Sequence, residues 1–424
     1  SVNGHPVDKI EVIVLGGTWD SYDVSYHRKF VTEVYFAANI FYDTEIREMK
    51  TMEEEIKINE TALCKIIGLT IETRPDQINE YQIKRCLSYG VTRVQIGVQH
   101  TSNKILKKIN RQCTIEDAKN AIFMLKEAGL KVLTHWMPNL PGASPEIDKE
   151  MFDEINFNSD LKSDDIKIYP TIVTQTSDKD ESKVYTEIEK WYIRGKYIPY
   201  SNEELHDVII HGKIYMHESV RISRIFRDIP KPNILGGADE PNMRQILTEK
   251  MNSEGLECKC IRCVEVKDNK VNPENIKIII REFEASKSKE YFISAESNEK
   301  RRLLHGFTRL RIPFNKGNSF IEEIDGCALI RELHVYGQLI PTFNTNNYLY
   351  NQHKGIGRKL IQTAEDIAYT NGFKKISVTS GVGVRKYYEK LGYSLSQYYM
   401  IKKLNKDTNL ETLNIYSIVN NILI

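Results

Sequence analysis

The chain has 424 residues, which is more than one hydrophobic core usually serves and predicts two or three domains. Its 59 basic and 58 acidic side chains nearly cancel, so a nucleic-acid surface would have to be a local patch and not a global excess of charge. The sequence contains no run of about 18 apolar residues, and its first residues lack a signal-peptide pattern. We therefore expect a cytoplasmic protein without a membrane segment.

Short apolar runs alternate with helical patterns through the first 170 residues, at the spacing of βα units. This rhythm predicts a parallel sheet or barrel, whose sites would lie at the C-terminal ends of the strands. Thr114 and Asp117 form a helix-capping pattern, and Gly129 ends that helix. The predicted strands are residues 9–15, 65–71, 92–98, 131–135 and 165–169.

The second half of the chain predicts another α/β domain. Residues 200–229 have a helical pattern, and residues 230–270 are rich in Pro and Gly and predict an irregular linker. In the second domain we expect strands at 277–284, 324–330, 333–335, 375–379 and 399–402 and a helix at 356–371. The predicted division is a barrel over 1–229, a linker with a cysteine cluster over 230–274, a second domain over 275–404, and a tail over 405–424 without an assigned function.

A glycine-rich turn, Gln352-His353-Lys354-Gly355-Ile356-Gly357, precedes the helix expected at 356–371. Such a turn presents the free N–H groups and the dipole of a helix N-terminus to a pyrophosphate. Together with the strand before it and the phrase "GVRKYYEKLGY" at 383–393, the turn resembles the GNAT acetyltransferase superfamily. That resemblance implies acetyl-CoA contacts at Glu332, Leu333, His334, Val335, Gly355, Ile356, Gly357 and Tyr388.

Two adjacent tyrosines in this phrase, Tyr387 and Tyr388, are the candidate catalytic residues. The resemblance implies that a tyrosine here protonates the departing thiolate of coenzyme A, and a phenol is a suitable donor to a sulfur of lower pKa. For each ring, aromatic packing is the alternative interpretation.

Nine phrases extend the resemblance over almost the whole chain. With them, the sequence resembles the family of the Elongator catalytic subunit, tRNA-uridine acetyltransferases (carboxymethyluridine synthases) that join a radical-SAM barrel to a GNAT domain. The phrases are "GHPVDKIEVIVLGGTW" (4–19), "GLTIETRPD" (68–76), "VQIGVQH" (94–100), "HWMPNLPG" (135–142), "DDIKIYPT" (164–171), "RIFRDIP" (224–230), "CKCIRC" (258–263), "RELHVYG" (331–337) and "HKGIGRKL" (353–360).

This second resemblance implies a reaction. A radical made from S-adenosylmethionine at a 4Fe-4S cluster would convert the acetyl group of acetyl-CoA into a carboxymethyl group on carbon 5 of the wobble uridine. Lys9 would be a further acetyl-CoA contact. The S-adenosylmethionine contacts would be Gly16, Gly17 and Thr18, with Glu72, Arg74 and Gln99 as weaker candidates for which a salt bridge or packing is the alternative.

The family's cluster loop, with three cysteines before the first strand, has no counterpart in this sequence. We interpret Cys64, Cys86 and Cys113 as buried small apolar side chains. The expectation is a truncated chain that binds acetyl-CoA and tRNA but does not generate the radical.

A separate cysteine cluster, Cys258-x-Cys260-x-x-Cys263, lies in the predicted linker. Three thiolates within six residues suit zinc, with a fourth ligand from elsewhere that the sequence does not identify. The resemblance also points to a structural metal at this place.

The expected partner is tRNA. Arg221, Arg224 and Arg227 would share one face of the predicted helix and contact phosphates, with a solvated helix face as the alternative. Lys167 and Tyr169 follow a predicted strand, where a flipped uridine would stack on the tyrosine ring. Other Elongator subunits and a homodimer stay open as further partners.

Three functional hypotheses follow from the sequence. The first is a tRNA-modifying enzyme that uses acetyl-CoA. The second is a protein lysine acetyltransferase, for which Glu332 is the candidate base. The third is a non-catalytic RNA-binding or assembly subunit.

Overall fold

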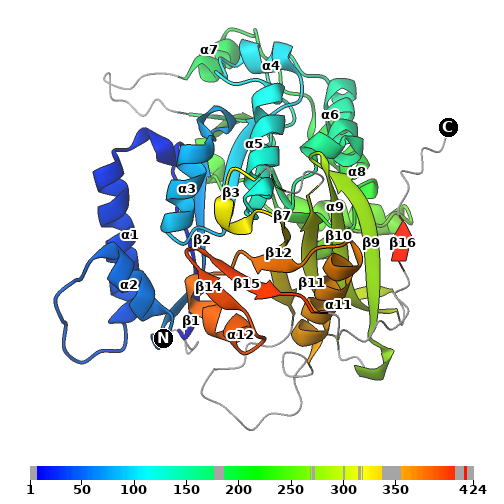
Figure 1. Ribbon diagram of the computed structural model, residues 1–424. Helices are drawn as coiled ribbons and strands as arrows, with labels where there is room; N and C mark the ends of the chain where they lie inside the picture. The colour runs from blue at the N-terminus through cyan, green and yellow to red at the C-terminus, as the bar shows by residue number, and fades with distance from the viewer. Residues whose placement is uncertain are drawn as a thin grey trace.

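The computed structural model describes residues 7–175, 186–267, 269, 273–298, 301–313, 317, 319–336, 355–405 and 415–417. Two large sheets lie side by side, the first built from the N-terminal half of the chain and the second from the C-terminal half (Figure 1). No helix among these residues is long and apolar enough to cross a membrane.

The first sheet has six strands in the order β1-β2-β3-β4-β5-β7, and every neighbouring pair is parallel. β1 and β7 are its two edges, so this part of the fold is an open half-barrel. The five strands predicted from residue 9 to 169 are all present, and β7 is an additional strand. Their bounds are β1 (Lys9–Ile13), β2 (Lys65–Thr73), β3 (Arg93–Gln99), β4 (Lys131–Trp136), β5 (Asp165–Ile168) and β7 (Arg221–Ile225).

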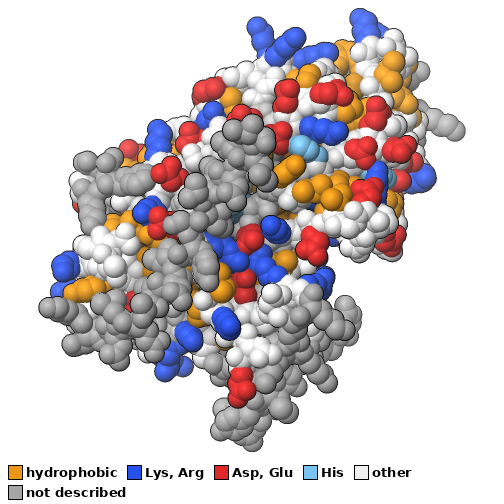
Figure 2. All heavy atoms as spheres, turned by 90° about the vertical axis from the view of Figure 1, so that its right-hand side faces the viewer, with side chains coloured by type: hydrophobic (Ala, Val, Ile, Leu, Met, Phe, Trp, Pro, Cys, Tyr) orange, Lys and Arg blue, Asp and Glu red, His pale blue; other side chains and the backbone are white. Residues whose placement is uncertain are grey.

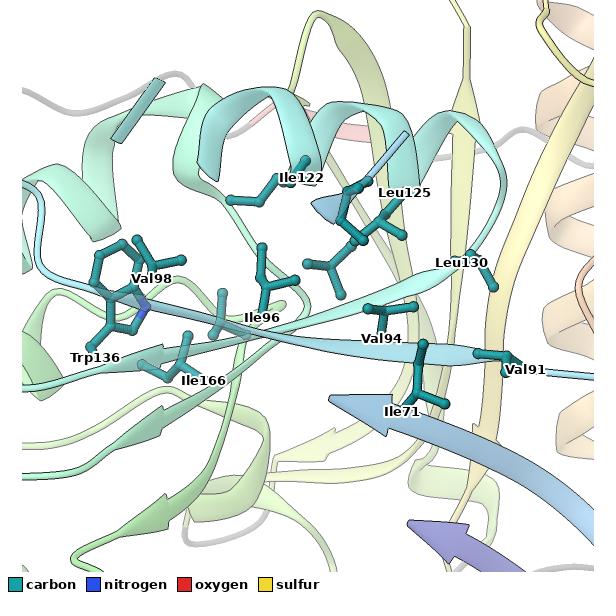
Figure 3. Packing of buried hydrophobic residues seen from close by; sticks show 14 of the residues in the cluster. Ile71, Val91, Val94, Ile96, Val98, Ile122, Leu125, Leu130, Trp136 and Ile166 are labelled. Carbon is teal, nitrogen blue, oxygen red and sulfur yellow. The ribbon is translucent and has the colours of Figure 1, made fainter. Parts of the chain in front are cut away.

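Helices cover the outer face of the half-barrel. On α5 the predicted capping is confirmed, because the Thr114 side chain accepts from the Asp117 N–H while the Asp117 side chain accepts from the Thr114 N–H. Figure 3 shows Ile122 and Leu125 of this helix pointing toward the strand residue Ile96, and all three are fully buried or nearly so. Burying each such side chain contributes about 1.5–3 kcal/mol. The helices are α1 (Val24–Asn39), α2 (Met52–Asn59), α3 (Glu80–Ser88), α4 (Asn103–Lys108), α5 (Ile115–Glu127), α6 (Pro145–Phe157), α7 (Glu187–Ile193) and α8 (Asn202–Ile214).

The second sheet has eight strands in the order β14-β15-β13-β12-β11-β10-β9-β16, packed against α11 (Ile356–Thr370) and the short α12 (Arg385–Glu389). The strands predicted at 277–284, 375–379 and 399–402 and the helix at 356–371 are confirmed, and the two runs predicted at 324–330 and 333–335 form one strand. The bounds are β9 (Lys277–Ala285), β10 (Ser288–Asn298), β11 (Arg302–Ile312), β12 (Cys327–Val335), β13 (Lys375–Val378), β14 (Ser394–Ser396), β15 (Tyr399–Lys403) and β16 (Ile415–Ser417).

The prediction of one helix over 200–229 is wrong in its second part. The helix α8 ends at Ile214, and residues 221–225 form the edge strand β7. The β-branched Ile222 and Ile225 are buried on this strand, which pairs with β5. The three-residue spacing of the arginines imitated a helical period.

The prediction of an irregular linker over 230–270 is also wrong in part. β8 (Ile234–Gly237) pairs with β6 (Ile172–Thr174), and α9 (Met243–Ser253) and the short α10 (Ile261–Val264) follow. α9 buries Met243, Leu247 and Met251 on one face. The Pro and Gly residues that precede α9 hid its helical pattern.

One hydrophobic cluster extends over parts of both sheets, beside a separate cluster between the second sheet and α11. Leu329 of β12 and Tyr399 of β15 belong to the same apolar cluster as the half-barrel strands. Buried charges also cross this boundary, since Arg331 donates to both carboxylate oxygens of Asp164 at 2.7 Å and to Glu290 at 2.8 Å. The halves are therefore joined by apolar packing and by charge pairs.

Candidate functional site

A cavity of about 270 Å³ lies where the N-terminal ends of the parallel strands meet the second sheet, and we call it the inter-sheet cavity. The first residues of β3, β4, β5 and β7 line one side of it. Glu332, Leu333, His334 and Tyr388, four of the predicted acetyl-CoA contacts, line the other. The half-barrel residues of this lining are Arg93, Lys131, Asp165 and Arg221.

Glu332 is held between two cations in this cavity. Lys131 donates to Glu332 Oε1, and Arg309 Nε donates to Oε2 at 2.8 Å. Burial alone would raise the pKa of Glu332, but the charges of Lys131 and Arg309 outweigh it and lower the pKa to about 2. A carboxylate with so low a pKa is a poor proton acceptor at neutral pH.

The two candidate tyrosines occupy different positions on α12. Tyr388 is buried and lines the inter-sheet cavity, where burial raises the pKa of its hydroxyl well above the usual value. Tyr388 therefore keeps its proton at neutral pH and is the better placed donor. Tyr387 is 39% exposed and does not line this cavity; its hydroxyl lies 2.8 Å from where a Cβ on Gly357 would be.

The glycine turn ends at the first turn of α11. Gly355 has a left-handed backbone (φ 75°) and precedes the buried Ile356. A Cβ on Gly357 would lie 3.6 Å from Val335 and 3.9 Å from Leu333. The start of α11 and the end of β12 are therefore close enough to contact the same ligand, as predicted for acetyl-CoA. Gly355, Ile356, Gly357 and Val335 do not line the inter-sheet cavity itself, and Gln352, His353 and Lys354 lie outside the described residues.

Lys9 stands at the start of β1. Its ammonium group lies 3.9 Å from Asp8, and it does not line the inter-sheet cavity, whereas Glu11 two residues later does.

A second cavity, of about 400 Å³, lies at the C-terminal ends of the same strands, and we call it the strand-end cavity. Four predicted S-adenosylmethionine contacts line it, together with two predicted tRNA contacts, Lys167 and Tyr169. Gly16 and Gly17 have positive φ (143° and 98°), which favours glycine there. The four are Gly16, Gly17, Glu72 and Gln99.

The remaining predicted contacts of that cofactor lie elsewhere. Arg74 forms an ion pair with Asp76 and does not line the cavity. Its contacts here are those of the salt bridge that was the alternative interpretation. Thr18 does not line it either; its carbonyl accepts from the Ser21 hydroxyl at 2.7 Å.

The interior of the half-barrel between the two cavities is polar. Gln95 Oε1 accepts from Lys167 Nζ at 2.7 Å and from His135 Nε2 at 3.1 Å. Burial, together with the charges of Lys167 and Arg227, lowers the pKa of His135 to about 3, so this imidazole is neutral. Along β5, Asp165 lines one cavity and Lys167 the other, so the same strands serve both.

The prediction that Arg221, Arg224 and Arg227 share one helix face is wrong. On the strand β7, Arg221 turns to the inter-sheet cavity, where it donates to Glu265 at 3.0 Å and to the Tyr336 hydroxyl at 2.8 Å. Arg224 and Arg227 instead line the strand-end cavity. Arg221 pairs with Asp165 at the start of β5, and Arg224 pairs with Lys167 further along that strand. The arginines are therefore separated along the strand direction, toward the two opposite ends where the cavities lie.

Comparison with known proteins matches this architecture. Residues 7–155 match the radical SAM superfamily model, 163–253 the radical SAM C-terminal domain, and 350–393 the GNAT acetyltransferase family. A Methanocaldococcus infernus protein named tRNA uridine(34) acetyltransferase is 42% identical over 95% of this chain and 73% of its own length. The chain belongs to this family. Schizosaccharomyces pombe Elongator complex protein 3 is 36% identical over 95% of this chain and 72% of its own length.

A solved structure supports the same membership. The M. infernus Elp3 with an N-terminal deletion superimposes with a TM-score of 0.85 at 41% identity, covering 95% of this chain and 92% of that one. The half-barrel followed by a GNAT-type sheet is therefore the architecture of the family.

The cysteines of the described residues do not fit the 4Fe-4S cluster that the resemblance implies. Such a cluster is held by cysteine thiolates. The S-adenosylmethionine contacts that the resemblance implies lie mostly at the strand-end cavity. Among the described residues, the only group able to hold a metal through three cysteines is Cys258, Cys260 and Cys263, and these three do not line that cavity. Cys64, Cys86 and Cys113 are buried and belong to no such group among the described residues.

The cysteine cluster in the linker does fit a metal. The sulfur atoms of Cys258, Cys260 and Cys263 lie within 4.8 Å of one another. Hydrogen bonds from Cys258 and Cys260, followed by the charges of Lys213 and Arg244, lower the pKa of Cys263, whereas the neighbouring thiols and burial raise the pKa of Cys258. A set of three thiolates is the donor type that zinc prefers.

Proposed function

We propose that this chain acts on uridine 34 of tRNA with acetyl-CoA as the acetyl donor. The observation that carries the proposal is the pair of cavities at the two ends of one parallel sheet, the first of them closed by the GNAT-type sheet. The printed names of relatives that match 95% of this chain supply the substrate class.

The acetyl end of acetyl-CoA would lie in the inter-sheet cavity. Its pyrophosphate would face the N–H groups at the start of α11, where Gly357 has no side chain to obstruct the approach. The chain of the coenzyme would then follow Leu333 and Val335 toward Tyr388. Tyr388 would protonate the thiolate when the thioester is cleaved.

The uridine would enter the strand-end cavity. The Tyr169 ring offers a stacking surface, and Lys167, Arg224 and Arg227 supply positive charge for the adjoining phosphates. S-adenosylmethionine would use the backbone of Gly16 and Gly17 and the Glu72 carboxylate, whose pKa burial raises. We assign to this chain the binding of both substrates and the cleavage of the thioester.

A protein lysine acetyltransferase is the second candidate function, and one observation counts against it. Its base would have to be Glu332. Burial raises the pKa of this carboxylate, but the charges of Lys131 and Arg309 outweigh burial and lower the pKa to about 2. A base that weak does not deprotonate a lysine ammonium at neutral pH.

The placement of the base is tested by photocrosslinking. A tRNA carrying 4-thiouridine only at position 34 should crosslink to the peptide that contains Lys167 and Tyr169, and a Tyr169→Leu variant should crosslink less. The matched control is the same tRNA with 4-thiouridine only in the acceptor stem, which should not label this peptide. Crosslinks from position 34 that map only outside the strand-end cavity would contradict the proposal.

Zinc at Cys258, Cys260 and Cys263 is part of the proposal. Replacing Cys260, which is fully buried, by serine should remove the bound zinc and lower the free energy of unfolding by several kcal/mol, because metal binding is coupled to folding. Metal analysis and denaturant unfolding measure both effects. The control is Cys327→Ser, a buried cysteine outside the metal group, which should keep the zinc. A well-folded wild-type protein without zinc would refute the assignment.

We also propose the wider assignments that the sequence suggested. The domain division at 229, 274 and 404 and a cytoplasmic location belong to this proposal. Relatives are named Elongator complex protein 3, and this supports further subunits of such a complex as partners besides tRNA. A homodimer is the other partner that we propose, and light scattering tests it.

A further inference from the structure

A third cavity, of about 380 Å³, lies beside the cysteine cluster and has more cations than acidic residues in its lining; we call it the linker cavity. Its acidic lining residues are Glu218 and Glu257. The six cations that matter here come from α8, α9, the α10 region and the start of β11. They are Lys213, Arg244, Lys259, Arg262, Lys267 and Arg301.

Most of this positive charge is not neutralised within the described part of the chain. No ion pair there involves Lys259, Arg262, Lys267 or Arg301, and all four are exposed. The carboxylate of Glu218 is already engaged by Arg281 and Arg302. Figure 2 shows lysine and arginine side chains gathered near the middle of the face on the side of α8, α9 and β9.

A buried cation in the same cavity points to an anion. Lys213 is only 1% exposed, and no hydrogen bond or ion pair among the described residues uses its ammonium group. Its charge acts on Cys263, so the thiolates supply part of the counter-charge that a buried cation needs. A zinc ion with three thiolates would carry one net negative charge, which leaves most of the surrounding cations unmatched.

We propose that the linker cavity binds phosphate groups of an RNA backbone, and this inference rests on the proposed function. Guanidinium groups bind phosphate in bidentate fashion, and clustered Lys and Arg give salt-dependent affinity for a nucleic-acid strand. RNA is the phosphate source that the proposed substrate supplies. The cavity is separate from the strand-end cavity, because the two share no lining residue, so it would hold a part of the tRNA away from the wobble base.

The test measures tRNA affinity of the full chain by fluorescence anisotropy across a series of salt concentrations. Arg262→Gln and Lys259→Gln should each weaken binding roughly threefold to tenfold and reduce the salt slope by about 0.7–0.9 for each phosphate that the variant no longer neutralises. The control is Arg194→Gln, an exposed arginine outside the linker cavity. Zinc content and thermal unfolding, measured alongside, should match wild type in all three variants.

The inference is overturned if both cavity variants bind tRNA with the wild-type affinity and salt slope. It is overturned as well if they lose only the binding of tripolyphosphate or coenzyme A, because the site would then serve free phosphates. At saturating tRNA, both variants should still release coenzyme A at the wild-type rate. Failure of the wild-type protein to respond to tRNA in that release assay would instead refute the proposed function.

Discussion

Replacing Arg331 by methionine should lower the free energy of unfolding by about 3–5 kcal/mol, because it removes the guanidinium that two buried carboxylates share. The guanidinium of Arg331 is fully buried and binds Asp164 of the half-barrel and Glu290 of the second sheet. Burial alone would raise the pKa of Glu290, but nearby cations, Arg331 first among them, outweigh it and lower the pKa to about 2. Methionine fills a similar volume but supplies no charge.

Denaturant unfolding followed by circular dichroism measures this loss. The matched control is Arg194→Met, an exposed arginine whose replacement should change the free energy of unfolding by less than about 0.5 kcal/mol. The loss should shrink when the pH falls far enough to protonate Glu290, since a lowered pKa stabilises the fold only while the carboxylate is ionised. Equal midpoints for the two variants would show that the buried charges do not join the two halves.

Replacing Tyr388 by phenylalanine should slow tRNA-stimulated release of coenzyme A by roughly 10²–10⁴-fold, the usual contribution of a general acid. Tyr388 lines the inter-sheet cavity and keeps its proton because burial raises the pKa of the hydroxyl. The affinity for acetyl-CoA should change little, because the ring remains.

Two neighbouring tyrosines provide controls for this variant. Tyr387→Phe removes a hydroxyl that does not line the inter-sheet cavity. Tyr393→Phe removes a buried hydroxyl that donates to Glu365 at 2.8 Å, so it should affect stability more than the chemical step. If Tyr387→Phe abolishes release while Tyr388→Phe leaves it intact, the two roles are reversed.

The half-barrel was largely predictable because its strands are short apolar runs between clear helix caps. The second sheet was less so: β10 and β11 were not predicted, since Glu290, Arg309 and Arg311 place charges inside strands that are buried almost throughout. Those charges are satisfied only by residues distant in sequence, such as the bond from Arg311 to Glu127. A local sequence pattern therefore cannot identify these partners.

The candidate site shows the same division. Residues in short motifs, such as Gly16, Glu72 and Tyr388, were found and line the cavities. Lys131, Gln95 and Arg309 were missed as site residues because the role of each depends on a partner in another strand. One local signal was available, since polar residues alternate along the buried strand from Asp165 through Lys167 to Tyr169.

We propose above that tRNA is the acceptor for which this chain cleaves acetyl-CoA. Release of coenzyme A from acetyl-CoA tests this proposal most directly. The purified chain is incubated with acetyl-CoA alone, with tRNA, or with a histone peptide, and free thiol is measured. We expect release that rises with tRNA and does not respond to the peptide. Release that rises with the peptide, or none under any condition, would contradict it.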